Sequence, residues 1–134
     1  MPRLDFDHLV IGAASLRQGV DWVEGKLGVV MPPGGSHPRM GTHNHLTALG
    51  RDSFLEVIAV DPAAEPPARP RWFALDDPAR RTSLEARPRL LTWVAATGDI
   101  EASLALASAA GAELGRAVEM TRGELTWLIS VAPN

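Results

Sequence analysis

The sequence predicts an α+β fold: two βαβββ-type modules, the second lacking its last strand, form one cupped mixed sheet with helices on its outer face. Three observations favour this fold. Each half of the chain carries strand-like alternation around one helix-like apolar stripe. The two stripes superimpose when the sequence is shifted by 84 residues. The length of 134 residues suits one structural domain.

The first module is expected over residues 1–60. Alternating side chains predict a strand over residues 4–12, with Phe6 and His8 on one face and Asp7 on the other. The helix that follows has Ser15 as a good N-cap and Gly28 as its C-terminal stop. The other strands of this module are expected at Val29–Met31, His43–Leu49 and Ser53–Val60, with the turn-rich residues 32–42 as a loop.

A Pro-rich linker is expected over residues 61–88, in which Trp72 docks on the core and a short helix starts at Asp77. The second module, over residues 89–134, repeats the order of strand, helix and strands. Its helix has Asp99 as N-cap and ends at Gly111. Its strands are expected at Arg89–Ala96, Glu113–Met120 and Glu124–Val131.

An internal duplication explains the repeated order of elements. The shift of 84 residues places Ser15 on Asp99, Leu16 on Ile100, Val20 on Leu104 and Val23 on Ala107. The position that would match Glu56 is 140, which is past Asn134. We therefore expect the second module to lack one strand and its sheet to keep an unpaired edge.

Composition and charge exclude several classes of protein. The chain has no Cys, which rules out disulfide scaffolds and thiolate chemistry. The net charge of −3 argues against a nucleic-acid partner. The sequence contains no apolar run of the roughly 20 residues that would cross a membrane, and its N-terminus lacks a signal-peptide pattern, so a cytoplasmic protein is expected.

Three stretches carry a resemblance to a known family: residues 4–13, 33–46 and 54–62. They are similar to the glyoxalase-like domain proteins of the vicinal oxygen chelate superfamily, which includes glyoxalase I, extradiol dioxygenases and bleomycin- and fosfomycin-resistance proteins. The resemblance is densest over residues 4–75 and looser over residues 89–134. Since one fold hosts many chemistries, the resemblance leaves the reaction open.

The resemblance implies metal ligands at His8 and Glu56, in the first and last strands of the first module. In the second module the first-strand position is Thr92, so only two of the superfamily's usual three or four ligands remain. A carboxylate between Phe54 and Ile58 is costly unless it is paired or coordinated. Either an ion pair between His8 and Glu56 or a shared Zn²⁺, Fe²⁺, Ni²⁺ or Mn²⁺ ion would explain both residues.

Other polar and aromatic side chains complete the candidate site. His43 and His45 share one strand face, with Asn44 on the other, and either His is a candidate general base or third ligand. Trp72, Trp127 and Thr92 are candidates for lining a ligand pocket, although core packing also explains each Trp. His37 is expected at the surface of a loop, and Trp93 is expected to face the helices.

Three hypotheses follow. The first is a glyoxalase-like enzyme that binds a small oxygenated molecule in the cup and acts on it by metal-assisted isomerisation, bond cleavage or oxygenation. The second is a metal-free binding protein of the same fold for a drug or metabolite. The third is an assembly or truncation product without chemistry of its own. A homodimer is expected because an unpaired sheet edge favours pairing between chains.

Overall fold

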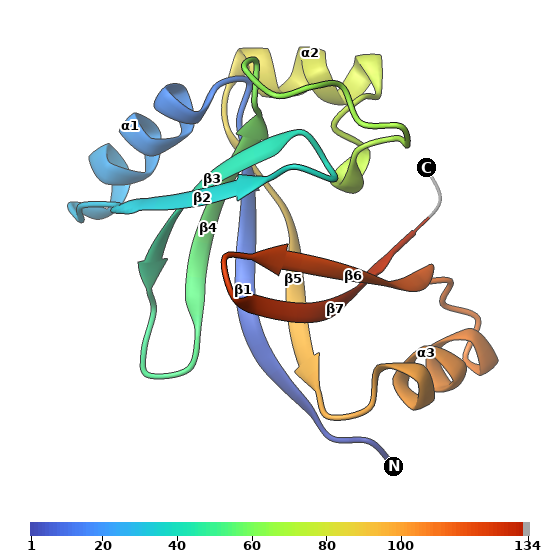
Figure 1. The fold of residues 1–134 in the computed structure, drawn as a ribbon. Helices are drawn as coiled ribbons and strands as arrows, with labels where there is room; N and C mark the ends of the chain where they lie inside the picture. The colour runs from blue at the N-terminus through green and yellow to red at the C-terminus, as the bar shows by residue number, and fades with distance from the viewer. Residues whose placement is uncertain (133–134) are drawn as a thin grey trace.

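The computed structural model describes residues 1–132. In these residues the chain forms seven strands, three α-helices and one short 3₁₀ turn (Figure 1). Their bounds are β1 Leu4–Gly12, α1 Leu16–Leu27, β2 Pro33–His37, β3 Thr42–Ala48, β4 Phe54–Val60, η1 Trp72–Ala74, α2 Pro78–Ala86, β5 Arg89–Thr97, α3 Ile100–Ala109, β6 Arg116–Arg122 and β7 Leu125–Val131.

Five strands form a mixed sheet in the order β2-β3-β4-β1-β5. β1 runs parallel to β4, and the other neighbours are antiparallel. β6 and β7 form a separate antiparallel hairpin, which lies across β1 and β5 in Figure 1. Met120 and Val131 of this hairpin pack in one core with Val10 and Ile58 of the sheet. The predicted α+β fold is therefore confirmed. We call the face of the five-stranded sheet that the hairpin covers the inner face.

Helix α1 covers the opposite, outer face of the sheet. Its Val23 packs in a second core with Leu55 and Val57 of β4. Both predicted helix signals are confirmed: the Ser15 hydroxyl accepts a hydrogen bond from the Gln18 amide at 3.2 Å, and Gly28 ends the helix with a φ of 64°. The sequence therefore determines where α1 starts and stops, and its apolar stripe determines which side faces the sheet.

The linker is anchored to the first half of the chain. Trp72 is buried, as predicted, and the Asp77 side chain caps α2 by accepting from the Arg80 amide. The Arg71 side chain donates to Asp76 at 2.7 Å and to the carbonyl oxygen of Gly41 at 3.3 Å. These contacts hold the linker against the turn between β2 and β3.

The predicted strand Val29–Met31 is wrong, and so is the loop predicted over 32–42, because β2 occupies residues 33–37. The side chains of β2 show no alternation that would predict a strand. Its position depends instead on close packing against β3. A Cβ on Gly34 would overlap the Asn44 side chain, so the neighbouring strand accepts only glycine here. Met31 instead fills the core beneath α1.

The second half repeats the first without its last strand. In the described residues β5 pairs only with β1, and β7 pairs only with β6. In the first half β4 lies between β3 and β1, whereas no described residue lies in a strand between β7 and β5. Trp93 lies on the helix side of the sheet, as expected, because it pairs with Leu9, which packs beneath α1. It is nevertheless 63% exposed, since α1 packs mainly on β3 and β4 rather than on β5.

No helix in residues 1–132 combines the length and the apolar character needed to cross a membrane.

Candidate functional site

Strand register brings polar residues together on the inner face of the sheet. β1 and β4 are aligned so that Val10 lies opposite Glu56, and β3 and β4 so that Leu46 lies opposite Glu56. Because side chains alternate along a strand, His8, Asn44 and Glu56 all point to this face. The cluster lies between the sheet and the β6–β7 hairpin, and Glu56 is 6% exposed.

The centre of the cluster is the pair formed by His8 and Glu56. His8 Nε2 lies 3.6 Å from Glu56 Oε1, and the His8 ring stacks on Phe54 with a centroid separation of 4.3 Å. Stacking limits rotation of the imidazole, so Nε2 remains directed at the carboxylate. The structure therefore brings together the two residues that the resemblance marks as metal ligands.

A β-bulge places a second carboxylate beside His8. The β1–β5 register shifts between Phe6 and His8, so Asp7 is an extra residue in β1. Asp7 consequently points to the same face as His8, contrary to the prediction of simple alternation, and Phe6 points to the outer face. The His8 Nδ1–H group donates to Asp7 Oδ2 at 2.6 Å. This hydrogen bond fixes the ring so that Nε2 is the nitrogen that faces Glu56.

Asn44 holds the other oxygen of Glu56. Its Nδ2 donates to Glu56 Oε2 at 2.6 Å, and its Oδ1 accepts from the Gly35 amide at 2.8 Å. The amide is thus oriented by β2 and in turn orients the carboxylate of β4. The alternation in the sequence predicted that Asn44 lies on the opposite strand face from His43 and His45, but no function was predicted for it.

His37 and Trp72 extend the network through Thr42. The His37 Nδ1 atom lies 3.0 Å from Thr42 Oγ1, which also accepts from Trp72 Nε1 at 3.2 Å. His37 Nε2 lies 3.4 Å from Asn44 Nδ2 and is positioned to accept from it. His37 is 8% exposed, so its predicted surface position is wrong. The formation of β2, which the sequence did not predict, is what buries it.

The charges in the cluster shift three pKa values. Burial lowers the pKa of His8, but its interactions with Glu56 and Asp7 outweigh burial and leave this pKa raised. Burial raises the pKa of Glu56, but His8, Asn44 and His37 leave it lowered. Burial lowers the pKa of His37, as do the charges of Arg122 and His43, against the opposing effect of Glu56. Near neutral pH the cluster therefore holds an ionised Glu56 and a neutral His37.

His43 and His45, the other two histidines predicted for the site, lie on the outer face of the sheet, whereas Glu56 lies on the inner face. His43 pairs with Ala59 and His45 with Val57, which packs beneath α1. The His45 Nδ1–H group donates to the carbonyl oxygen of Met31 at 2.8 Å, and His43 Nδ1 lies 3.9 Å from Asp61. The structure does not bring these two side chains to the His8–Glu56 pair.

The three residues predicted to line a pocket lie on the inner side of the molecule. Thr92 pairs with Val10 on the inner face of β5, and Trp127 packs against the core from β7. Trp72 lies edge-on to His37 with ring centroids 4.9 Å apart. Two of the three are core residues as well, which is the alternative that the sequence left open.

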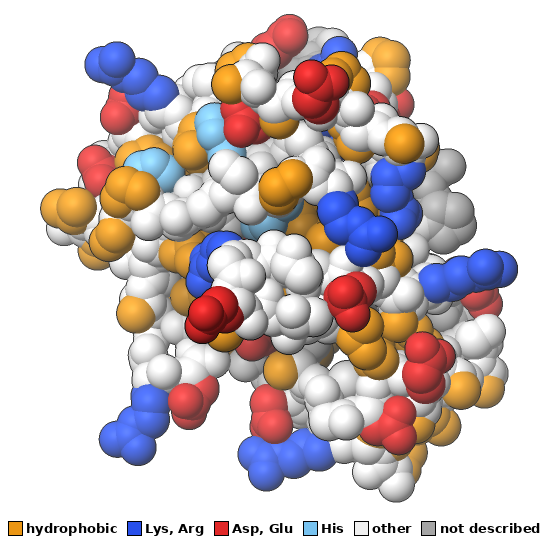
Figure 2. All heavy atoms as spheres, in the orientation of Figure 1, with side chains coloured by type: hydrophobic (Ala, Val, Ile, Leu, Met, Phe, Trp, Pro, Cys, Tyr) orange, Lys and Arg blue, Asp and Glu red, His pale blue; other side chains and the backbone are white. Residues whose placement is uncertain are grey.

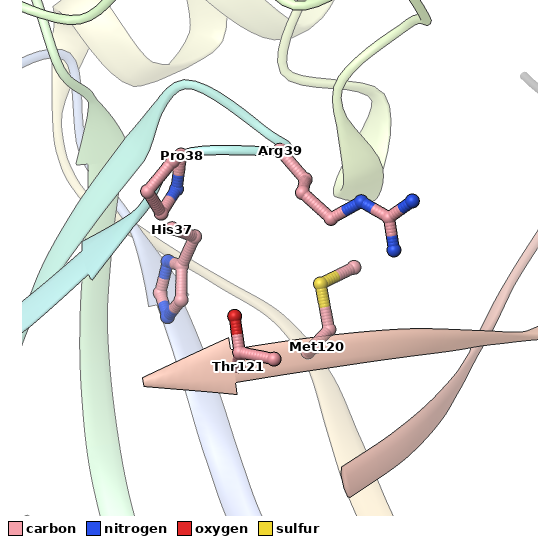
Figure 3. Close-up of a pocket in the computed structure, with 5 residues that line it drawn as sticks. All are labelled: His37, Pro38, Arg39, Met120 and Thr121. Carbon is pink, nitrogen blue, oxygen red and sulfur yellow. The ribbon is translucent and has the colours of Figure 1, made fainter. Parts of the chain in front are cut away.

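A small cavity adjoins the cluster at His37. It is lined by His37, Pro38, Arg39, Met120 and Thr121, and Figure 3 shows the His37 ring directed toward Thr121 of β6. Arg39 donates to the carbonyl oxygen of Glu119 at 2.7 Å and so connects the β2–β3 turn to the hairpin. Figure 2, in the orientation of Figure 1, shows basic and hydrophobic side chains over the region where this turn meets the hairpin. The cavity therefore lies between the β2–β3 turn and β6, with His37 as the residue that it shares with the cluster.

A family model described as a glyoxalase-like domain matches residues 6–134. No curated protein matches the chain in sequence.

Solved structures share the fold at low sequence identity. Methylmalonyl-CoA epimerase from Mycobacterium tuberculosis is 16% identical, with a TM-score of 0.55 over 92% of this chain and 77% of that chain. A methylmalonyl-CoA epimerase variant from Streptomyces coelicolor in complex with 2-nitronate-propionyl-CoA is 18% identical, with a TM-score of 0.54 over 93% and 84%. A hypothetical protein from Staphylococcus aureus is 16% identical, with a TM-score of 0.60, and the match covers 96% of this chain but 54% of that one.

Proposed function

Because the chain belongs to the glyoxalase-like domain family, we propose that it binds a small oxygenated molecule at the inner face of the sheet and isomerises it by proton transfer. The observation that carries this proposal is the buried pair of His8 and Glu56, with Asp7 and Asn44 fixing the orientation of both side chains. Two of the similar structures are epimerases, which agrees with an isomerase class.

The donor set fits a divalent metal ion with an open coordination shell. A neutral imidazole nitrogen and a carboxylate oxygen suit Zn²⁺, Fe²⁺, Ni²⁺ or Mn²⁺. Donor atoms 3.6 Å apart leave room for an ion about 2.1 Å from each of them. Among residues 1–132 no group of three or more His, Asp or Glu side chains is placed to hold an ion, so water or substrate oxygens would complete the shell.

When bound, the ion would polarise a substrate oxygen and stabilise the negative charge that develops on proton removal. The residues around it have distinct roles. Asp7 keeps the His8 ring in one tautomer, and Asn44 keeps the Glu56 carboxylate in one orientation. Trp72 and Met120 restrict water at this end of the sheet.

We propose His37 as the group that accepts the proton. It lines the cavity, is neutral near pH 7 because its pKa is lowered, and lies next to Asn44 in the network. His43 and His45, the bases predicted from the sequence, would have to act from the opposite face of the sheet. Their catalytic role stays a prediction.

The position of His8 between two carboxylates, 2.6 Å from Asp7 and 3.6 Å from Glu56, favours a metal-free binding protein as the second candidate. The raised pKa of His8 means that the ring takes up a proton readily between the carboxylates of Asp7 and Glu56. In that state the His8 imidazolium pairs with both carboxylates and offsets part of their charge without a metal ion. The two candidates differ in whether an ion displaces this proton.

Calorimetric titration with Mn²⁺, Ni²⁺ and Zn²⁺ separates them. We expect one site per chain for at least one ion, weakened about 100-fold or more in His8→Ala and in Glu56→Ala. His43→Ala is the matched control, since this histidine lies on the other face, and should bind as wild type does. If wild type binds none of the ions, the metal-dependent enzyme is rejected in favour of the binding protein.

Proton transfer is tested directly by deuterium incorporation. Wild-type protein in D₂O with methylmalonyl-CoA should exchange the proton next to the thioester carbonyl, as followed by NMR, and His37→Gln should slow this exchange at least 100-fold. The same rate in His37→Gln as in wild type would remove His37 from the reaction.

A further inference from the structure

Two arginines meet where β2, an edge strand of the five-stranded sheet, lies against β6 of the hairpin. Arg39, in the turn after β2, donates through Nη1 to the carbonyl oxygen of Glu119 in β6 at 2.7 Å. Arg122, in β6, packs its side chain on β2, since a Cβ built on Gly35 would lie 3.0 Å from Arg122 Cδ and 3.7 Å from Cγ. One arginine therefore reaches across this border from each side.

Arg122 is directed toward the part of the sheet that carries His37. Val118 and Met120 of β6 pack in the core with the sheet, and alternation along the strand places Arg122 on the same face of β6. After burial, which has the largest effect, the positive charge of Arg122 helps to lower the pKa of His37, against the opposing effect of Glu56. The guanidinium group and the imidazole are thus near enough for their charges to interact.

The two guanidinium groups keep free hydrogen-bond donors. Within residues 1–132 neither Arg39 nor Arg122 forms an ion pair, whereas Arg71 and Arg81 both pair with Asp76. Arg39 engages the hairpin carbonyl through Nη1, and Arg122 contacts β2 through aliphatic carbons. Both side chains are exposed, and the net charge of the whole chain is −3, so the pair is a local concentration of positive charge in an acidic protein.

The cavity at this border has the size of a single functional group. Its volume is about 50 Å³, and Arg39, His37 and Thr121 supply its polar lining. A single water needs roughly 10–15 Å³ of such space, so the cavity admits a group of a few heavy atoms rather than a whole metabolite. Figure 3 shows the Thr121 hydroxyl oxygen directed toward the turn that carries His37, and the Arg39 side chain extending over Met120.

We propose that Arg39 and Arg122 bind an anionic group, a carboxylate or a phosphate, of the molecule that the site takes, with Thr121 as a further donor. Guanidinium groups bind both anions through paired N–H groups. This inference rests on the proposed function, because it names the class of substrate: a small oxygenated acid. Its charged end is held between β2 and β6, and that contact orients the rest of the molecule toward His37.

Titration with malonate and with inorganic phosphate, at constant ionic strength and without any divalent ion, tests for the anion site. Malonamide is the matched ligand control, because it has the size of malonate but no charge. We expect saturable binding of at least one anion with a dissociation constant of about 1 mM or below, measured by calorimetry, and no binding of malonamide. In NMR spectra the ring resonances of His37 should move on binding, whereas those of His45, on the outer face, should not. The tighter of the two anions identifies the group.

Substitution of each arginine tests which residues hold the anion. Arg39→Gln and Arg122→Gln should each weaken binding about 10-fold or more, because each removes a charged hydrogen-bond donor. Arg51→Gln is the matched control, since Arg51 is an exposed arginine in the turn between β3 and β4, and it should bind as wild type does. Circular dichroism reports whether each variant is folded.

The anion site and the proposed function can fail separately. Wild type that binds neither anion, equal binding of malonamide, or unchanged affinity in both Arg39→Gln and Arg122→Gln would each overturn the anion site, whatever the result of the metal titration. Malonate binding by a protein that binds no metal ion and exchanges no deuterium would instead support the anion site and reject the isomerase.

Discussion

The two halves of the chain start with the same local signals and reach different degrees of burial. Ser15 and Asp99, related by the 84-residue shift, cap α1 and α3 in the same way, each accepting a backbone N–H from three residues ahead. Helix α1 buries Gly19 and Val23, whereas α3 buries no residue. Of the 15 buried hydrophobic residues in the described part of the chain, residues 1–132, 13 lie in residues 1–88, and Met120 and Val131 are the two beyond them.

This difference shows that a capping residue and an apolar stripe determine where a helix forms, but not whether the helix is buried against a sheet. In the first half, β4 lies between β3 and β1 and completes a surface on which α1 packs. In the second half, β5 is separated from the β6–β7 hairpin, which packs on the inner face of the other sheet instead. Figure 2 shows hydrophobic side chains reaching the surface over α3, beside acidic ones.

We expect the largest effect on stability from truncating a leucine to alanine in the first half, compared with the same truncation in the second half. Leu55→Ala in β4 removes a side chain that is 3% exposed and packs beneath α1, so we expect the free energy of unfolding to fall by about 3 kcal/mol. Leu128→Ala in β7 removes one that is 54% exposed, and we expect a loss below about 1 kcal/mol. Urea denaturation measures both, and equal losses would contradict the contrast between the halves.

The equivalent N-caps Ser15 and Asp99 allow the same comparison of the two halves, with a smaller expected loss of stability. Ser15→Ala should lower the free energy of unfolding by about 1 kcal/mol, because α1 unfolds together with the core. Asp99→Ala should have less effect on global unfolding, because α3 buries no residue, and should instead speed amide hydrogen exchange within α3. A larger global loss from Asp99→Ala than from Ser15→Ala would show that α3 belongs to the cooperative core.

The smallest expected effect concerns the linker and depends on pH. Burial raises the pKa of Asp76, but its hydrogen bonds with Arg71 and Arg81 leave it lowered from the ordinary 3.8. A lowered folded-state pKa stabilises the protein above pH 3.8, and this contribution is lost as the pH falls below that value. Asp76→Asn should therefore cost less than about 1 kcal/mol at pH 7, since Asp76 is partly exposed, and still less at pH 3. Thermal melts at the two pH values measure it; a constant difference would exclude a charge effect.

Most of the fold could be predicted from local signals. Alternation gave β1, β3, β4 and β7, and caps gave the starts of α1, α2 and α3. β2 escaped because its glycines are selected by close contact with Asn44, which no local pattern reports. The face on which Trp93 lies could be predicted, but its exposure could not, because exposure depends on whether a helix packs over β5. The division into modules 1–60 and 89–134 with a linker between them stays a prediction.

The candidate site was predictable only in its centre. His8 and Glu56 share a face because Val10, two residues after His8 in β1, lies opposite Glu56 of β4. Asp7 joins them through a bulge, which flips one residue to the other face of the sheet. His37 reaches the cluster through β2. A sequence signal for Asn44 exists, since it alternates with His43 and His45 and therefore lies on the opposite strand face from them.

The sequence by itself determined the helices and every strand except β2, the duplication, the absence of thiol chemistry and the burial of a carboxylate at position 56. These properties depend on contacts between near neighbours or on composition. Tertiary structure decided which residues surround that carboxylate, which helix is buried and which strand edge stays open. Those outcomes depend on strand register and on a bulge, where a shift of one residue reverses the face of every side chain that follows.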